Sequence, residues 1–179
     1  NLIEGSIQGI FIEREWKVLF ANQAFADILG YDSPDEVLAL PSSELLTVPA
    51  ERDRMRAYYE LRLAGENAPT HYEYEGLRKD GSSVALQNVV RLVSWDGQPA
   101  AQSVVVDVSD RKRAEMALQH QSALEEMITN ISARFINLTS LEIDDGIAHA
   151  LRDIGEFSEV DRASVVLFSE NYTQITLAF

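Results

Sequence analysis

The stretch that decides the fold is Val104-Val105-Val106-Asp107-Val108-Ser109, which runs directly into Asp110-Arg111-Lys112-Arg113-Ala114-Glu115. The first six residues are mostly β-branched and favour a strand. The next six are charged and rich in helix formers, and no Gly or Pro separates the two halves. We therefore predict a strand that continues into a helix without a flexible joint, so that displacement of the sheet moves the helix. Such a coupling suits a module that transmits a signal better than it suits an enzyme.

Upstream of this junction, the residue pattern predicts two hairpins that flank a helical block. The polar turn Glu13-Arg14-Glu15-Trp16 and the dipeptides Asp80-Gly81 and Asp96-Gly97 are typical of hairpin turns. Asn22 is the expected N-cap of the first helix, and Gly30 is expected to end it in the left-handed conformation. The expected elements are strands at 6–12 and 17–21, helices beginning after Asn22, at Ser33 and at Glu51, and strands at 70–77, 83–95 and 100–109. This order predicts an α+β fold, with one five-stranded antiparallel sheet and short helices on one face.

Beyond Ser109, the apolar positions repeat with the spacing of a coiled coil. Steps of three and four residues connect Ala114, Ala117, Gln121, Leu124, Ile128, Ile131, Phe135 and Leu138. A helix over 110–137 would be about 42 Å long. We predict a homodimer through the stronger part of this seam, formed by Leu124, Ile128, Ile131 and Phe135. The alternative is an amphipathic helix that packs on its own domain.

The composition excludes several classes of function. Acidic residues outnumber basic ones by 17 to 9 through Ser109 and by 12 to 6 beyond it, and the net charge is −14, so we expect no nucleic-acid partner. The absence of cysteine excludes disulfides, cysteine zinc sites, iron–sulfur clusters and thiol nucleophiles. No apolar run approaches the roughly 20 residues of a transmembrane helix and no secretory signal is present, so we expect a cytoplasmic chain. It holds no metal motif, nucleophile–base pair or Gly-rich phosphate loop, which predicts a regulatory, non-enzymatic role.

Residues 1–109 resemble a PAS domain, a sensory fold of bacterial signalling proteins. The resemblance rests on the order and spacing of short pieces over roughly 105 residues. The pieces are Asn22-Gln23-Ala24-Phe25, Leu29-Gly30-Tyr31, Arg62-Leu63-Ala64-Gly65-Glu66, Tyr72-Glu73, Arg78-Lys79-Asp80-Gly81-Ser82, Asp96-Gly97 and Asp107-Val108-Ser109. The last piece looks like the Asp-Ile-Thr exit motif of the family. The resemblance implies a PAS sensor domain at 1–109 followed by a signalling helix at 110–137.

Residues 138–179 resemble the opening of a GAF domain. The matching pieces are Ile131-Ser132-Ala133 on the entry helix, the helix through Leu151, and Asp161-Arg162-Ala163-Ser164. The chain stops at Phe179 inside an apparent strand, so we expect an incomplete GAF-like α/β segment. The arrangement is similar to the sensory half of bacterial histidine kinases or cyclic-di-GMP enzymes. It implies a module that passes a PAS signal to an effector domain of the same polypeptide; the alternative is a ligand-free interaction and dimerisation module.

The resemblance also implies an internal pocket, and the residues narrow what it holds. PAS domains bind flavin, haem, small acids or nothing. The absence of cysteine excludes a flavin–cysteine adduct. Haem in PAS sensors is held by a His on the helix that corresponds to 51–63 here, and this helix contains no His. His71, the only His before Ser109, suits an edge position better than a haem ligand. Non-covalent flavin or a small metabolite stays compatible. The candidate lining residues, which would otherwise simply be the core, are Phe25, Ile28, Leu46, Met55, Tyr59, Tyr74, Leu86, Asn88 and Val90.

Three polar residues stand out as functional candidates. Asn88 lies among Val and Leu and needs a partner if it faces inward, so it is a candidate to hold a ligand carbonyl or amide. Asp107 and Ser109 lie at the start of the long helix and are candidates for signal transmission. The carboxylate of Asp107 either accepts orphan N–H groups of the helix or pairs with Arg78 or Lys79. The alternative is that Asp107 is an exposed residue at the end of the strand, where its charge would contribute little to stability.

Overall fold

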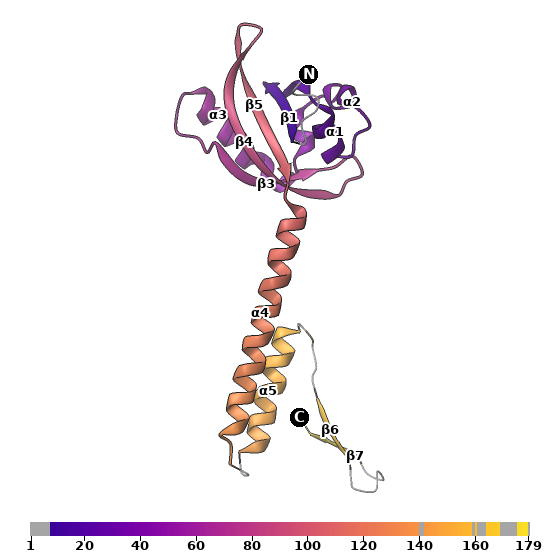
Figure 1. Cartoon of the computed structure of the whole chain (residues 1–179), viewed down its shortest axis with the longest axis vertical. Coiled ribbons are helices and arrows are strands. Elements are labelled where there is room, and N and C mark those ends of the chain that lie inside the picture. Colours follow the sequence, from indigo (N-terminus) through magenta and orange to yellow (C-terminus); the bar gives the residue numbers. More distant parts are fainter. Residues whose placement is uncertain (1–7, 140–141, 159, 161–163, 169–174, 179) are drawn as a thin grey trace. The chain divides into compact units, whose positions relative to one another are not determined.

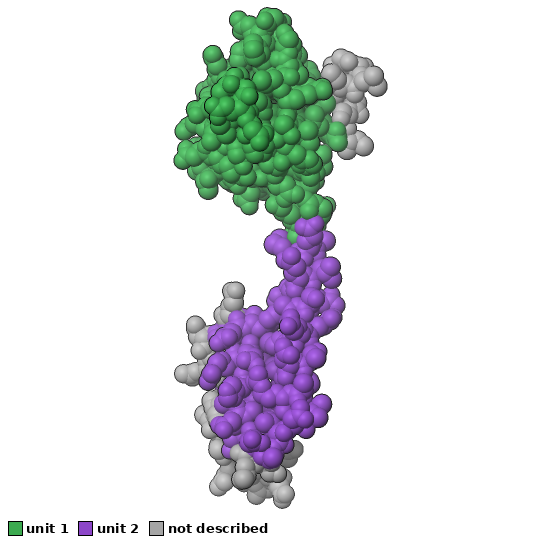
Figure 2. Space-filling model, turned by 90° about the vertical axis from the view of Figure 1, so that its left-hand side faces the viewer, with its two compact units in different colours: residues 1–113 green, residues 114–179 purple. Residues whose placement is uncertain are grey.

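Figure 1 shows the computed structural model of the chain, which describes residues 8–139, 142–158, 160, 164–168 and 175–178. The chain divides into two compact units, residues 1–113 and 114–179, which Figure 2 colours separately. Helix α4 (Ser109–Ile136) begins in the first unit and continues into the second. Among the helices of the described ranges, none combines the length and apolar character that crossing a membrane requires.

The first unit is a five-stranded antiparallel sheet with helices inserted after its second strand. The strands are β1 (Gly9–Arg14), β2 (Lys17–Ala21), β3 (His71–Leu77), β4 (Ser83–Trp95) and β5 (Gln98–Asp107). The inserted elements are α1 (Gln23–Ile28), α2 (Pro34–Leu38), the 3₁₀ turns η1 (Ser43–Leu46) and η2 (Pro49–Glu51), and α3 (Arg52–Leu63). The strand order is β2-β1-β5-β4-β3, so the first and last strands pair at the centre of the sheet. The predicted α+β sheet is confirmed.

The core lies between one face of this sheet and the inserted helices (Figure 1). The ring of Phe25 on α1 stacks on Phe11 of β1, with ring centroids 4.5 Å apart. On β3, Gly76 lets the sheet pack closely, because a Cβ there would lie 2.7 Å from Cδ1 of Leu86. The largest fully buried side chains are Phe25, Leu29, Leu86, Val37, Val84, Val105 and Asn22.

Asn22 joins the first strand to the first helix. Its Oδ1 accepts the backbone N–H of Phe25 at 3.0 Å, which is the predicted N-cap. The same oxygen accepts the N–H of Ile10 at 2.8 Å, and Nδ2 donates to the carbonyl of Gln8 at 3.0 Å. The helix then ends before Gly30, whose φ of 73° is the left-handed conformation predicted for it.

The turn of the first hairpin is shorter than the sequence predicted. Only Glu15 and Trp16 adopt positive φ angles, 49° and 63°. Glu13 and Arg14 instead belong to β1, where Glu13 pairs with Val18 of β2 after a register irregularity. Glu13 is therefore a strand residue and not a turn residue. Because side chains alternate along a strand, it lies on the same inward face as Phe11.

In the second unit, the later part of α4 packs against α5 (Ile143–Phe157) of the same chain. The ring of His120 stacks on Phe157 at 4.8 Å, and Arg134 pairs with Asp153 at 3.2 Å. Gly146 of α5 fits against α4 and the residues after it, since its Cβ would lie 2.3 Å from Cδ1 of Leu138. Strands β6 (Val165–Phe168) and β7 (Ile175–Ala178) form an antiparallel pair.

This packing divides the predicted dimer seam. Leu124 and Ile131 are half-buried, whereas Ile128 is 52% exposed and Phe135 is 37% exposed. The intrachain alternative therefore describes part of the helix, and the homodimer remains a prediction. The piece at 161–163 that supported the GAF resemblance, and the start of the strand expected at 6–12, lie outside the described residues.

Candidate functional site

A cavity of about 50 Å³ lies between the inner face of the sheet and helix α3. Its walls combine residues of β1, η1, α3, β3, β4 and β5. Seven predicted residues line it: Phe25, Leu46, Met55, Tyr59, Tyr74, Asn88 and Val90. Two predicted residues do not line it. Leu86 is fully buried in the core beside Gly76, and Ile28 packs at the edge of the core, close to Gly9.

The cavity is more polar than the sequence analysis indicated. Its walls also contain Glu13, Ser43, Glu44, Thr47, Arg52, Arg62, Tyr72 and Ser103. The hydroxyl of Ser43 donates to the Glu13 carboxylate. Burial raises the pKa of Glu13, while the Ser43 hydrogen bond and the positive charge of Arg62 lower it. Sequence alternation from Phe11 would have identified Glu13, had the hairpin turn been placed at Glu15 and Trp16.

Asn88 is the polar centre of the sheet side of this cavity. It is 3% exposed, and its Nδ2 donates to the hydroxyl of Tyr72 at 2.9 Å and to that of Ser103 at 3.4 Å. Its Oδ1 is buried and accepts no hydrogen bond from the residues described. Native structures rarely leave such an acceptor unpaired, so this oxygen marks a place for a ligand or water donor. Asn88 therefore faces inward, which is the case in which the sequence makes it a candidate to hold a ligand.

Arg62 on α3 contributes a donor from the opposite wall. Its Nη1 donates to the carbonyl of Tyr58 at 3.2 Å and its Nη2 to that of Pro69 at 2.5 Å. The remaining group, Nε–H, is buried and has no partner within the described part of the chain. Sequence reasoning used Arg62 only as part of the PAS resemblance. A charged residue ending an amphipathic helix gives no sign that it turns inward.

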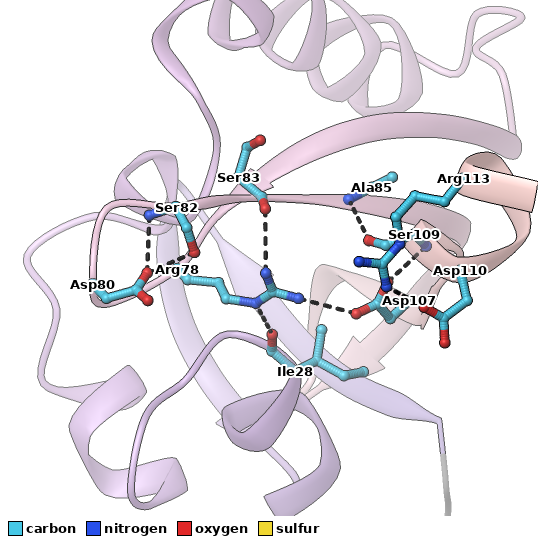
Figure 3. A network of polar contacts seen from close by, with 10 residues as sticks. All are labelled: Ile28, Arg78, Asp80, Ser82, Ser83, Ala85, Asp107, Ser109, Asp110 and Arg113. Atoms are coloured by element: carbon cyan, nitrogen blue, oxygen red, sulfur yellow. Dashed lines mark hydrogen bonds and ion pairs between the residues drawn. The ribbon is translucent and has the colours of Figure 1, made fainter. Parts of the chain in front are cut away.

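The junction between β5 and α4 is held by a network around Arg78 (Figure 3). Arg78 donates through Nε to the carbonyl of Ile28 at 3.1 Å and through Nη1 to that of Ser83 at 3.2 Å. Its Nη2 pairs with Oδ2 of Asp107 at 3.1 Å. The other oxygen of Asp107 accepts the backbone N–H of Ser109 at 2.8 Å. Asp107 thus makes both contacts that the sequence offered as alternatives.

Strand β4 is bonded to the same junction. The carbonyl of Ala85 accepts the N–H of Val108 at 2.9 Å, and its N–H donates to Oγ of Ser109 at 3.2 Å. Ser109 is the first residue of α4 and not the end of β5, because the Asp107 carboxylate turns the chain by capping its N–H. Lys79, the other predicted partner of Asp107, instead pairs with acidic groups near α2.

A second contact to α4 comes from the edge strand β3. Both oxygens of Glu73 are engaged, one by Arg111 and the other by Lys112 at 3.0 Å. These hydrogen bonds, first that of Lys112 and then that of Arg111, lower the pKa of Glu73. The backbone carbonyl of Glu73 accepts Nη2 of Arg54 on α3 at 2.9 Å. Strand alternation turns the neighbouring Tyr72 into the cavity and Glu73 out toward the helix.

No cluster of three or more His, Cys, Asp or Glu side chains with metal-binding geometry occurs among the described residues. The site is a small polar cavity whose walls include residues of β3, β4 and β5, the three strands that contact the first turn of α4.

Comparisons with known proteins agree with this architecture. A family model described as a PAS domain matches residues 7–110. The sensor histidine kinase TmoS of Ectopseudomonas mendocina is 31% identical over 132 residues, which are 72% of this chain but 13% of TmoS. This chain therefore spans only a small part of that relative.

Solved structures show the same fold. A domain of a sensory box sensor histidine kinase/response regulator from Geobacter sulfurreducens is 27% identical and superposes with a TM-score of 0.50, covering 59% of this chain and 88% of that one. A sensory box histidine kinase/response regulator from Burkholderia thailandensis is 24% identical with a TM-score of 0.51, covering 71% of this chain and 95% of that one.

Proposed function

This chain belongs to the PAS domain family, and from that premise we propose that its first unit senses a small ligand in the central cavity and passes the occupancy of that cavity to helix α4. It is a PAS sensory domain homologous to the sensor domains of histidine kinases. Binding of a ligand and transmission along the helix are the parts that we propose.

The observation that carries the proposal is the position of β4 between cavity and junction. Asn88 on this strand faces the cavity. Ala85, three residues away, is bonded to the chain on both sides of the helix start, at Val108 and Ser109. A hydrogen-bonded strand moves as a unit, so a ligand that draws Asn88 toward α3 shifts the first turn of α4.

Further along the polypeptide, we propose that α4 delivers this shift to an effector domain of histidine kinase type. The relationship to TmoS supports this assignment. The chain itself acts as a regulatory part and not as an enzyme. We also propose that the segment from α5 through β7 begins a GAF-like domain, which its helix and strand pair would suit.

A homodimer is the second part of the proposed mechanism. Two residues of the predicted seam, seven positions apart on α4, stay exposed, Ile128 at 52% and Phe135 at 37%. Burying this side of the helix between two chains would gain free energy in proportion to the buried area. The alternative function, a ligand-free dimerisation module, uses the same helix and differs only in leaving the cavity without a role.

Native mass spectrometry and visible absorption of the freshly purified chain distinguish these functions. The sensor proposal expects a small molecule that copurifies with the wild type and is lost from Ser103→Val, which adds methyl groups to the cavity wall. Gln102→Val is the matched control, because the neighbouring side chain lies on the opposite face of β5 and should leave the ligand bound. If the wild type and both variants are colourless and each has the mass of its own sequence, the ligand-free module is favoured.

A further inference from the structure

We propose that the cavity takes a small neutral molecule carrying a carbonyl group beside an N–H group, such as a primary carboxamide, a urea or a lactam. The proposal rests on the sensory function proposed above and specifies the ligand of the same cavity. It follows from two unpaired polar atoms, from the balance of charge around them and from the size of the space.

The first unpaired atom calls for an acceptor on the ligand. Two groups of the Arg62 guanidinium are already used on backbone carbonyls, at Tyr58 and Pro69, which hold the side chain in place. Its buried Nε–H is left without a partner among the described residues. A carbonyl oxygen is the acceptor that a single fixed N–H donor binds with good geometry.

The second unpaired atom calls for a donor on the same ligand. Tyr72 and Ser103 accept hydrogen bonds from Nδ2 of Asn88, which leaves Oδ1 on the other side of the side-chain amide. Its Oδ1 then accepts nothing within the described structure, although Asn88 is 3% exposed. An N–H group next to the ligand carbonyl satisfies this oxygen, whereas a ketone or an aromatic hydrocarbon leaves it unpaired.

The two atoms belong to one site. Both residues line the same cavity, and Tyr72 lines it with them. Its hydroxyl lies 2.9 Å from Asn88 Nδ2, and the charge of Arg62 is near enough to lower the pKa of Tyr72, against the larger effect of burial. A short planar amide carries its acceptor oxygen and its donor nitrogen on the same carbon atom, so one small group offers a partner to each of the two unpaired atoms.

Charge and size narrow the class further. The charged residues on the cavity wall are two acidic and two basic, namely Glu13, Glu44, Arg52 and Arg62. A ligand carboxylate would add an unbalanced charge beside Glu13, whereas a neutral amide adds none. The volume of about 50 Å³ is far below the roughly 300–1,000 Å³ of pockets that hold drug-sized ligands or cofactors. The ligand head that enters is therefore a few atoms across.

Three probes with the same number of non-hydrogen atoms test the class: propionamide, butanone and propionate. Their dissociation constants for the full chain are measured by ligand-observed NMR. We expect propionamide to bind about tenfold more tightly than butanone, which lacks the donor for Asn88. We expect a similar advantage over propionate, which adds charge.

Two variants locate the effect. Asn88→Leu should abolish the preference of the chain for propionamide over butanone. Arg62→Met should weaken the binding of both probes. The controls Gln87→Leu and Arg91→Met replace an amide and an arginine outside the cavity wall. They should leave the ratio of the propionamide and butanone dissociation constants unchanged. The comparison of probes on the wild type stands even if a variant fails to fold.

Equal binding of propionamide and butanone, a preference for propionate, or no saturable binding of propionamide would each overturn the proposed class. Tight binding of butanone or propionate that Ser103→Val removes would overturn the class while leaving the sensory function of the cavity supported.

Discussion

Replacing Asp107 by alanine removes two contacts at the start of α4, and the structure sets how much each is worth. The ion pair with Arg78 joins side chains that are 30% and 35% exposed, so it contributes about 0.5 kcal/mol. The hydrogen bond from the N–H of Ser109 is a helix cap worth about 1 kcal/mol. We therefore expect a loss of about 1.5 kcal/mol in the free energy of unfolding.

The rest of the network limits the damage. Arg78 keeps its hydrogen bonds to the carbonyls of Ile28 and Ser83 and stays in place without its carboxylate partner. An uncapped N–H at Ser109 also frees the first turn of α4 to open locally. Amide exchange at residues 109–113 should therefore accelerate beyond the roughly tenfold that a global loss of about 1.5 kcal/mol brings to the core strands.

Urea unfolding and amide hydrogen exchange on the same samples measure both quantities. Asp107→Asn is the matched control, because its side-chain oxygen still caps the Ser109 N–H and only the charge is lost. It should lose about 0.5 kcal/mol and keep most of the protection of the first turn. A loss of several kcal/mol in Asp107→Ala with unchanged exchange at 109–113 would refute a role in transmission and make Asp107 a purely structural residue.

Three further changes test other parts of the account. Glu73→Gln removes the charge that both basic residues at the base of α4 share, so amide exchange there should rise about threefold, whereas Glu75→Gln on the same face of β3 should leave it unchanged. Glu13→Gln should raise the melting temperature at neutral pH, because burial raises the pKa of Glu13 and its ionised form opposes folding; the gain should fade as the pH drops toward 4.5, and a constant gain would contradict it. Gly76→Ala should cost about 1–3 kcal/mol in urea unfolding, since its Cβ would lie 2.7 Å from Leu86; an unchanged midpoint would show that β3 yields freely.

The fold could be predicted from the sequence because the residues that indicate its helices and turns lie close together in the chain. Asn22 caps α1 and Gly30 ends it through interactions within a few residues, and short turn signals mark the later hairpins. The unbroken passage from β5 to α4 likewise follows from the residues on either side of Asp107. Such features need no knowledge of distant parts of the chain.

The polar residues of the cavity could not be predicted from the sequence, because their positions depend on contacts between distant parts of the chain. Glu13 enters the cavity only because the hairpin turn takes two residues, and Arg62 turns inward only because two backbone carbonyls hold its outer nitrogens. In the sequence, Glu73 is only part of one short piece of the PAS resemblance, and its partners on α4 lie 38 residues or more away. Residue spacing carries no signal for contacts of this kind.

The extent of the dimer seam shows the same limit. Heptad spacing identified an apolar stripe on α4 but left open what covers it. In the structure, Gly146 of α5 lies against Phe135 at the end of α4 and against Leu138 just after it, whereas Ile128 stays exposed. A single stripe thus serves an intrachain contact over part of its length, and a partner chain remains the prediction for the rest.

The central claim is that filling the cavity changes the start of α4, and amide hydrogen exchange in Ser103→Val measures this most directly. Ser103 is 2% exposed on the cavity wall, four residues before Asp107 on the same strand. The account predicts altered exchange at residues 109–113 in Ser103→Val, beyond any change in global stability, and wild-type exchange there in Gln102→Val. Exchange at 109–113 that follows global stability alone in both variants would contradict the claim that the cavity and the helix are coupled.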